Sequence, residues 1–135
     1  MSIQLSVAVR NARLDAIETT IGTSPILRIR TGAPPASCAT ADSGTILAEM
    51  TLPSDWMAAA SSGSKAKSGT WQDTSGNAAG TAAHYRIYDS AGTTCHEQGT
   101  VTATGGGGDM ELDNTSIAVG QQVTITTYSR TDANA

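Results

Sequence analysis

The 135-residue chain is long enough for a single domain with its own core. Ala, Thr, Ser and Gly supply about half of the residues, aromatic residues supply 4%, and Phe is absent. The net charge of −4 and the scatter of the Lys and Arg residues exclude nucleic-acid binding through a basic surface, because phosphate contacts require clustered cations. No apolar run approaches the ~20 residues that span a bilayer, and the N-terminus lacks the pattern of a secretion signal, so we expect a chain made in the cytoplasm without a membrane segment.

Residues 3–21 are predicted to form a helix. Apolar side chains recur there at three- and four-residue steps and form a stripe that comprises Ile3, Val7, Leu14, Ile17 and Ile21. Ser2 is the expected N-cap, Gly22 stands where a left-handed residue ends a helix, and Pro25 closes the boundary. The opposite side of the helix is polar and carries Gln4, Asn11, Asp15 and Glu18.

This apolar stripe is the candidate interface of the chain. A helix of this length is marginal in water on its own, so something must cover its apolar residues. We expect the β domain to cover part of the stripe and a neighbouring subunit or a particle surface to cover the rest. Arg10 completes the stripe and needs an acidic partner or an exit to solvent, which makes it a candidate contact for setting the register of the interface.

From residue 26 the hydrophobic period becomes two, which predicts strands. The predicted strands span 26–32, 45–53, 68–74, 82–89, 94–104, 115–122 and 121–131. Asp89 and Gly92 predict the turn of a hairpin, and Gly120 predicts a further turn. The expected fold is mainly β: a single small β-sandwich or meander domain (23–135) with an N-terminal α-helix (1–22).

The connecting segments differ in character. Residues 32–44 are interpreted as a loop bounded by Pro and Gly, and residues 61–69 as a polar, flexible connector. Residues 54–62 are predicted to contain a short helical turn, capped by Ser54, that places Trp56 and Met57 against the core.

The glycine run Gly105–Gly108 follows a predicted strand, as phosphate-binding loops do. A phosphate cradle also needs a basic or hydroxyl side chain and usually a helix N-terminus. Carboxylates follow instead, and residues 87–129 contain neither Lys nor Arg. We therefore interpret the run as a turn and expect no nucleotide or other cofactor.

Asp109, Glu111 and Asp113 alternate, so on one strand their carboxylates would share a face. Bound Ca²⁺ is one hypothesis for this cluster, but the spacing lacks the Gly and the distal Glu of an EF-hand loop. The favoured interpretation is a solvated acidic edge that opposes strand-to-strand aggregation, with no metal.

No catalytic constellation is indicated. Cys95 and His96 are adjacent on a strand and point to opposite faces, and His84 reaches them only across a hairpin without an orienting carboxylate. Asp42, Asp73 and Glu97 have no identifiable partner for a general-acid pair. Trp56 and Trp71 could line a carbohydrate groove, but core packing is the favoured role for tryptophans in a chain without Phe. We expect no enzyme.

Cys38 and Cys95 match no zinc-binding spacing. Two interpretations stay open for the pair: free thiols, as the reducing cytoplasm favours, or a bridge formed once the protein meets an oxidising medium.

Several stretches together resemble a family of small virion structural proteins of tailed bacteriophages and prophages. They are SVAVRNARLDAIETTIGTSPILRIRTGAPP, LPSDWMAAA, SGTWQD, HYRIYDSAGTTCHEQGTV and GGGGDMELDNTSIAVGQ, which cover nearly the full length. The family is described as structural, head-decorating or tail-fibre-associated, and it offers no catalytic residues for transfer to this chain.

The resemblance implies a virion protein that is assembled in the bacterial host cytoplasm and is a homo-oligomer. We expect a capsid decoration (cement) protein that binds the major capsid protein on the outer surface of the shell and stabilises it. The alternative is a tail, neck or fibre component in which the helix docks on the particle. A small glycan hydrolase would be a third class, which the missing acid pair disfavours.

Overall fold

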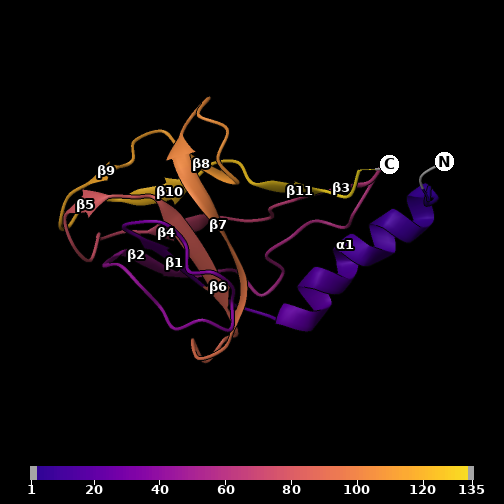
Figure 1. Cartoon of the computed structure of the whole chain (residues 1–135), viewed down its shortest axis with the longest axis horizontal. Helices are drawn as coiled ribbons and strands as arrows, with labels where there is room; N and C mark the ends of the chain where they lie inside the picture. The colour runs from indigo at the N-terminus through magenta and orange to yellow at the C-terminus, as the bar shows by residue number, and fades with distance from the viewer. Residues whose placement is uncertain (1–2, 134–135) are drawn as a thin grey trace.

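A computed structural model describes residues 3–133 of the chain. The fold is mainly β, with 36% strand and 11% helix, which confirms the fold class expected from the sequence. Helix α1 (Val7–Ile21) precedes all the strands of the described chain (Figure 1). The strands are β1 (Ile26–Arg30), β2 (Ile46–Thr51), β3 (Ser64–Ala66), β4 (Trp71–Asp73), β5 (Gly80–Thr81), β6 (His84–Tyr88), β7 (Cys95–Ala103), β8 (Met110–Leu112), β9 (Ser116–Ile117), β10 (Val123–Ile125) and β11 (Ser129–Thr131).

The main sheet has the strand order β2-β1-β6-β7-β8. Its pairs are antiparallel except β7 with β8, which run parallel. The remaining strands form two-stranded ladders, β10 with β4, β11 with β3 and β5 with β9. The β6–β7 hairpin turns at Asp89 and Gly92, as the sequence predicts: the amide of Gly92 donates to the carbonyl of Asp89 at 2.9 Å.

Strand β6 is buried along its whole length because both of its faces are covered. Tyr85 and Ile87 belong to the hydrophobic core. The alternate residues, His84, Arg86 and Tyr88, hydrogen-bond to residues of the 31–45 loop, which lies over the other face. This double cover explains how an Arg in the middle of a strand is only 1% exposed.

The two tryptophans lie in the core and are 1% exposed or less. Trp71 packs between Trp56 and Tyr128, with ring centroids 5.9 Å and 5.5 Å away and both neighbouring rings tilted by 40°. The indole N–H of Trp56 donates to the carbonyl of Gly22 at 2.9 Å, which ties the end of α1 to the core. The core role predicted for both residues is confirmed, and neither is accessible to a carbohydrate.

The glycine run makes the turn between the parallel strands β7 and β8. Parallel neighbours usually need a connection of a dozen residues or more, whereas here residues 104–109 bring the chain back to pair Val101 with Met110. Gly105 and Gly107 have φ of +86° and +82°, a conformation that glycine adopts without strain. The amides of the run bond internally: Gly107 donates to Glu111 at 3.0 Å and Gly108 to Thr102 at 2.9 Å, so they are not free to cradle a phosphate.

Several elements differ from the sequence-based expectations. Helix α1 begins at Val7 and is capped by Ser6, whose hydroxyl accepts from the amide of Val9 at 3.2 Å; the expected cap Ser2 lies outside the described residues. The predicted strand 121–131 splits into β10 and β11, because its pairing partner changes from β4 to β3.

The segment from Ser54 to Gly69 is also different. No helical turn forms at 54–62; the chain turns at Ser54 and Met57 forms a β-bridge with Lys67. The segment 61–69, expected to be a flexible connector, contains β3 instead. Pairing with β11 and a buried Lys65 hold it in place.

Candidate functional site

Helix α1 and the ribbon formed by β3 and β11 project together from the β domain, and we refer to these three elements as the arm (Figure 1). The arm carries the interface residues expected from the sequence. The packing of helix α1 against the ribbon therefore decides which of these interface residues a partner can reach.

The polar side of α1 packs against the ribbon. Lys65 of β3 is 2% exposed, and its ammonium group donates to Asp15 at 2.7 Å, to Glu18 at 2.8 Å and to the carbonyl of Ala58 at 2.8 Å. Burial disfavours the charged form, but the bonds to the two carboxylates raise the pKa of Lys65 above its usual range. The hydrogen bond from Lys65 lowers the pKa of Asp15, and the amide of Ala60 adds to this effect.

Three further contacts fasten the helix to the ribbon. Asn11 accepts from the amide of Gly63 at 2.8 Å. Arg10 donates to the carbonyl of Asp132, which follows β11, at 3.1 Å, and Arg13 forms an ion pair with the Asp132 carboxylate at 3.1 Å. Arg10 thus contacts a main-chain carbonyl of its own chain rather than an acidic side chain.

The apolar stripe is divided between the core and the surface. Leu14 and Ile21 are 3% and 6% exposed, and Ile17 packs against the core. Leu14 and Ile21 are covered by the chain itself, whereas Ile17 is only partly buried. Ile3 and Val7 are 84% and 45% exposed, so they are the part of the stripe that a partner can reach.

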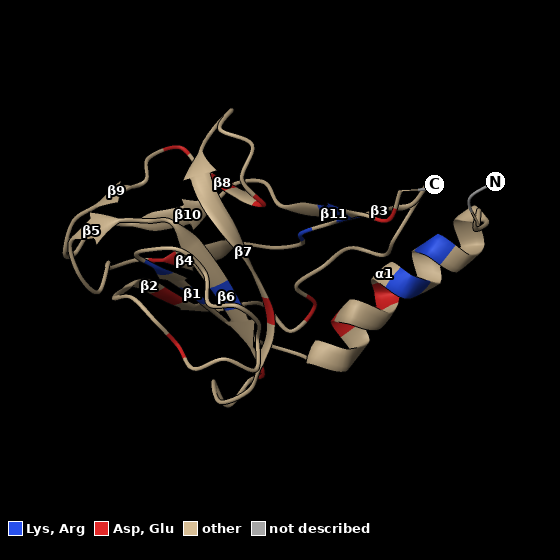
Figure 2. Cartoon of the chain, viewed as in Figure 1, with Lys and Arg blue, Asp and Glu red and all other residues tan. Residues whose placement is uncertain are grey.

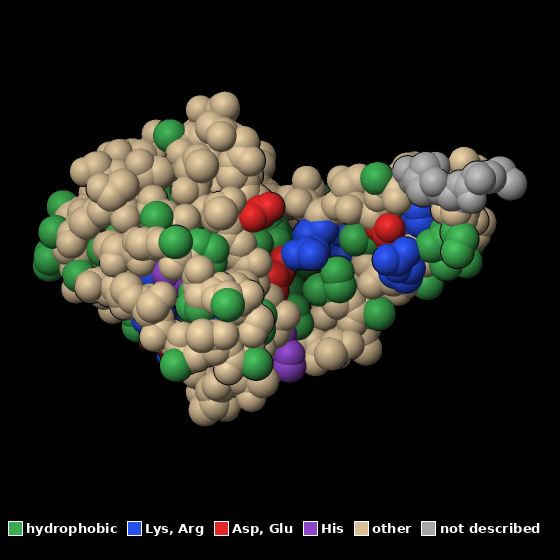
Figure 3. Space-filling model, in the orientation of Figure 1, with side chains coloured by type: hydrophobic (Ala, Val, Ile, Leu, Met, Phe, Trp, Pro, Cys, Tyr) green, Lys and Arg blue, Asp and Glu red, His purple; other side chains and the backbone are tan. Residues whose placement is uncertain are grey.

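A separate exposed face of α1, on the side away from Val7, carries Val9, which is 45% exposed, and the exposed Ala12 and Ala16. We refer to it as the exposed face of α1. This face is nearly free of charge, because all four charged side chains of α1 bond to β3 or to Asp132. Only Arg13, whose side chain is 60% exposed, borders it. In Figure 2 the charges of α1 fall within its middle turns, and Figure 3 shows hydrophobic side chains gathered near the tip of the arm.

A groove continues this face toward the β domain. It has a volume of about 270 Å³, and it is lined by Arg13, Ala16, Ile17, Thr20 and Ile21 of α1 and by His96 of β7. The small side chains of Ala16 and Thr20 allow a neighbouring backbone to approach closely. Sequence reasoning missed Val9, Ala12 and Ala16; the signal that could have found them is the absence of charged residues at these positions.

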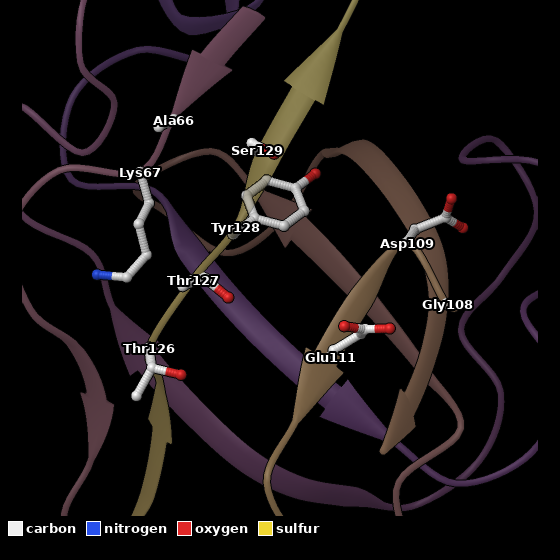
Figure 4. A pocket seen from close by; sticks show the side chains of 9 residues that line it. All are labelled: Ala66, Lys67, Gly108, Asp109, Glu111, Thr126, Thr127, Tyr128 and Ser129. Atoms are coloured by element: carbon white, nitrogen blue, oxygen red, sulfur yellow. The ribbon is translucent and has the colours of Figure 1, made fainter. Parts of the chain in front are cut away.

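A second hollow lies between β8 and residues 126–129 (Figure 4). It has a volume of about 500 Å³, with Lys67 at one side and Asp109 and Glu111 at the other. Each charge is engaged within the chain. Lys67 donates to the carbonyl of Gly69 at 2.7 Å, Asp109 accepts from the amide of Thr100 at 2.9 Å, and Glu111 accepts from the glycine run.

The acidic residues do not form a metal site in residues 3–133, where no three metal-ligating side chains gather. Only Glu111 lies in β8, while Asp109 turns toward Thr100 of β7. The shared strand face on which the Ca²⁺ hypothesis depended is therefore not present.

The chain matches no protein-family model, no curated protein and no solved structure. In the part of the chain that the structure describes, no helix is long and apolar enough to cross a membrane.

The candidate catalytic residues are not brought together. The sulfur of Cys95 lies 3.0 Å from that of Cys38, His96 borders the groove beside α1, and His84 is buried against the carbonyl of Gly32. Glu97 is buried and accepts from Tyr128 at 2.5 Å and from Arg130, an arrangement that joins β7 to the base of β11.

Proposed function

We propose that this chain is a structural protein of a tailed-bacteriophage virion, without enzymatic activity, that binds the outer surface of the major capsid shell through the exposed face of α1 and stabilises the shell. The observation that carries the proposal is the exposed, nearly uncharged face of α1 on a projecting arm. The virion setting rests on the resemblance of the sequence to phage structural proteins.

The energetics suit attachment. Full burial of a Val side chain contributes about 1.5–3 kcal/mol, so Val9, together with Ala12 and Ala16 on the same face of α1, provides a useful share of a binding free energy. The ion pairs of Lys65 hold α1 against the ribbon before it meets a partner, which reduces the ordering cost of binding. A homo-oligomer, which links several such faces, needs only a modest affinity at each site of the shell.

Val9→Asp is the substitution that tests this surface. Val9 is the third residue of α1, where an acidic side chain favours the helix through its dipole, so the change should not melt the helix. We expect it to abolish most co-sedimentation with purified virions, because a carboxylate would be buried without a partner.

Val119→Asp is the matched control. Val119 is 71% exposed and follows β9, at the far end of the β domain from α1 (Figure 1). We expect this variant to bind virions like the parent chain. Equal binding by both variants, with thermal stability unchanged, would contradict attachment through α1.

Binding to separately purified phage heads and tails shows where on the virion the chain attaches. A decoration protein binds purified heads and not tails. A chain that binds only tails, and loses that binding through Val9→Asp, would be the tail, neck or fibre component instead.

A further inference from the structure

The 31–45 loop crosses the outer face of the main sheet and brings Cys38 to Cys95 at the start of β7. The two sulfur atoms lie 3.0 Å apart although the residues are 57 positions apart in sequence. Both cysteines are half-buried, and both are free thiols.

Buried Arg86 of β6 holds the loop on both sides of Cys38. Its guanidinium donates to the carbonyls of Ser37 and Thr40, each at 2.9 Å, and to the carboxylate of Asp42 at 2.6 Å. The position of Cys38 is therefore fixed by the hydrogen bonds that its chain neighbours Ser37 and Thr40 accept from Arg86.

Asp42 adds two more bonds to the sheet. It accepts from the hydroxyl of Tyr88 at 2.6 Å and pairs with Arg30 at 3.0 Å. One carboxylate thus joins the loop to both β1 and β6, and two buried arginines share it.

We propose that Cys38 and Cys95 form a redox-controlled clasp, a disulfide that fastens the 31–45 loop to β7 when the protein leaves a reducing compartment. The oxidant is a low-molecular-weight disulfide such as oxidised glutathione. The thiolate of Cys38 attacks it and releases one reduced thiol, and Cys95 then displaces the second and closes the Cys38–Cys95 bond. The protein gives up two thiol protons and two electrons, and both sulfurs of the oxidant leave as thiols.

This order of attack follows from the surroundings of Cys95. Burial, together with the adjacent Cys38, raises the pKa of the Cys95 thiol to about 12. Cys95 is thus almost fully protonated near neutral pH and is a poor first nucleophile.

The clasp and the ionic contacts act on the same loop, so they are thermodynamically linked. Docking of the loop favours the disulfide by the same factor by which the disulfide favours docking, so a substitution that undocks the loop must weaken disulfide formation. This inference does not rest on the proposed binding to capsids.

The test uses the full chain equilibrated in glutathione buffers of graded ratio, followed by acid quenching, alkylation and mass measurement. We expect an intramolecular disulfide in the monomer and a Tm about 10 °C above that of the reduced chain. Cys38→Ser and Cys95→Ser should each give a Tm that does not respond to the buffer.

Asp42→Asn tests the link to the loop. We expect it to lower the equilibrium constant for disulfide formation about tenfold, because a charge-assisted hydrogen-bond network is lost. Asp113→Asn, the same change at an exposed aspartate after β8, should leave that constant unchanged.

Three results would overturn the proposal: two alkylated thiols at every buffer ratio, a glutathione attached to each cysteine, or disulfide-linked dimers. An Asp42→Asn chain that oxidises as readily as the parent would show that the loop contacts do not position Cys38.

Discussion

At the scale of single residues, His84 is a buried side chain in which only one of the two ring nitrogens has a hydrogen-bond partner among the described residues. Nδ1 lies 2.6 Å from the carbonyl of Gly32 and donates to it in the neutral ring, whereas Nε2 is buried without a hydrogen-bond partner among the described residues. Burial lowers the pKa of His84, and the charges of Arg30 and Arg86 lower it further against the opposing effect of the Gly32 carbonyl. His84 is thus neutral in the folded protein near neutral pH.

The lowered pKa predicts a pH-dependent stability. Below the unfolded-state pKa of about 6.5 the unfolded chain binds a proton at His84 that the folded chain does not, so the free energy of unfolding falls as the pH drops from about 7 to 5. Urea denaturation at a series of pH values should show this slope in the parent chain and a smaller one in His84→Asn. His96→Asn removes an exposed histidine and should keep the slope of the parent. Equal slopes in the parent and His84→Asn would contradict a neutral, buried His84.

The glycine run supports a second prediction at this scale. A Cβ at position 106 would lie 2.7 Å from Thr102 Cβ, and moving Thr102 would break its bond to the amide of Gly108. A Cβ at Gly107 meets no atom within 4 Å, but φ is +82° there. We expect Gly107→Ala to cost about 1 kcal/mol and Gly106→Ala about 2 kcal/mol.

Denaturation midpoints of the two single variants measure these costs. In a Thr102→Gly background, which removes the clashing Cβ and Oγ1, the cost of Gly106→Ala should shrink while that of Gly107→Ala should not. A larger cost for Gly107→Ala in the parent background would mean that strain, and not crowding, governs the turn.

At the scale of elements, α1 departs from the usual amphipathic helix, because its polar side is packed and part of its apolar side is open. The β3–β11 ribbon explains this arrangement. The ribbon offers the helix a buried ammonium group, main-chain amides and a carbonyl. These groups form hydrogen bonds and ion pairs with the carboxylates, the Asn and the Arg of α1, which apolar side chains of the helix could not form.

Two lysines on β3 and next to it provide a matched test of this docking. Lys65 bonds to α1, whereas Lys67 donates to Gly69 and lies over the ring of Trp71. We expect Lys65→Ala to lower the Tm by about 5 °C and to speed amide hydrogen exchange throughout α1. Lys67→Ala should leave exchange in α1 unchanged. Protection of α1 that survives Lys65→Ala would show that the apolar contacts of Leu14 and Ile21 hold the helix without the ion pairs.

At the scale of the whole molecule, the β domain satisfies its polar groups through internal contacts. The arm that it carries has an outer face with few charged or polar groups. The domain uses its tryptophans, its cysteines and its glycine run for internal contacts, and the open apolar surface is concentrated on the arm. Such a division between a self-contained domain and an attachment element suits a protein that acts by binding to an assembly.

Copy number tests that role for the intact particle. If the chain decorates the shell, its band in purified virions should be comparable in molar amount with that of the major capsid protein. A molar amount far below that of the capsid protein would place it in the tail, neck or fibre. Particles that lack the chain should also release their genome at a lower temperature than complete ones, since a decoration protein stabilises the shell.

The sequence by itself determined the features that depend on near neighbours. Helix α1, the strands β1, β2, β4, β6 and β7, the hairpin turn at Asp89 and Gly92, the turn at the glycine run and the core role of the tryptophans all follow from local period and turn chemistry. These signals are carried by residues a few positions apart, where the geometry of a helix or a strand already decides which side chains share a face.

Only the tertiary structure decided how distant segments meet. Strand β3 exists because β11, more than 60 positions away, pairs with it, and Lys65 is buried because α1 supplies two carboxylates. The same holds for the loop that covers β6, for the contact between Cys38 and Cys95, and for the part of the α1 stripe left open to a partner. In each case the burial of a polar or reactive group is favourable only when its partner is present, and a partner far along the chain leaves no periodic signal in the sequence.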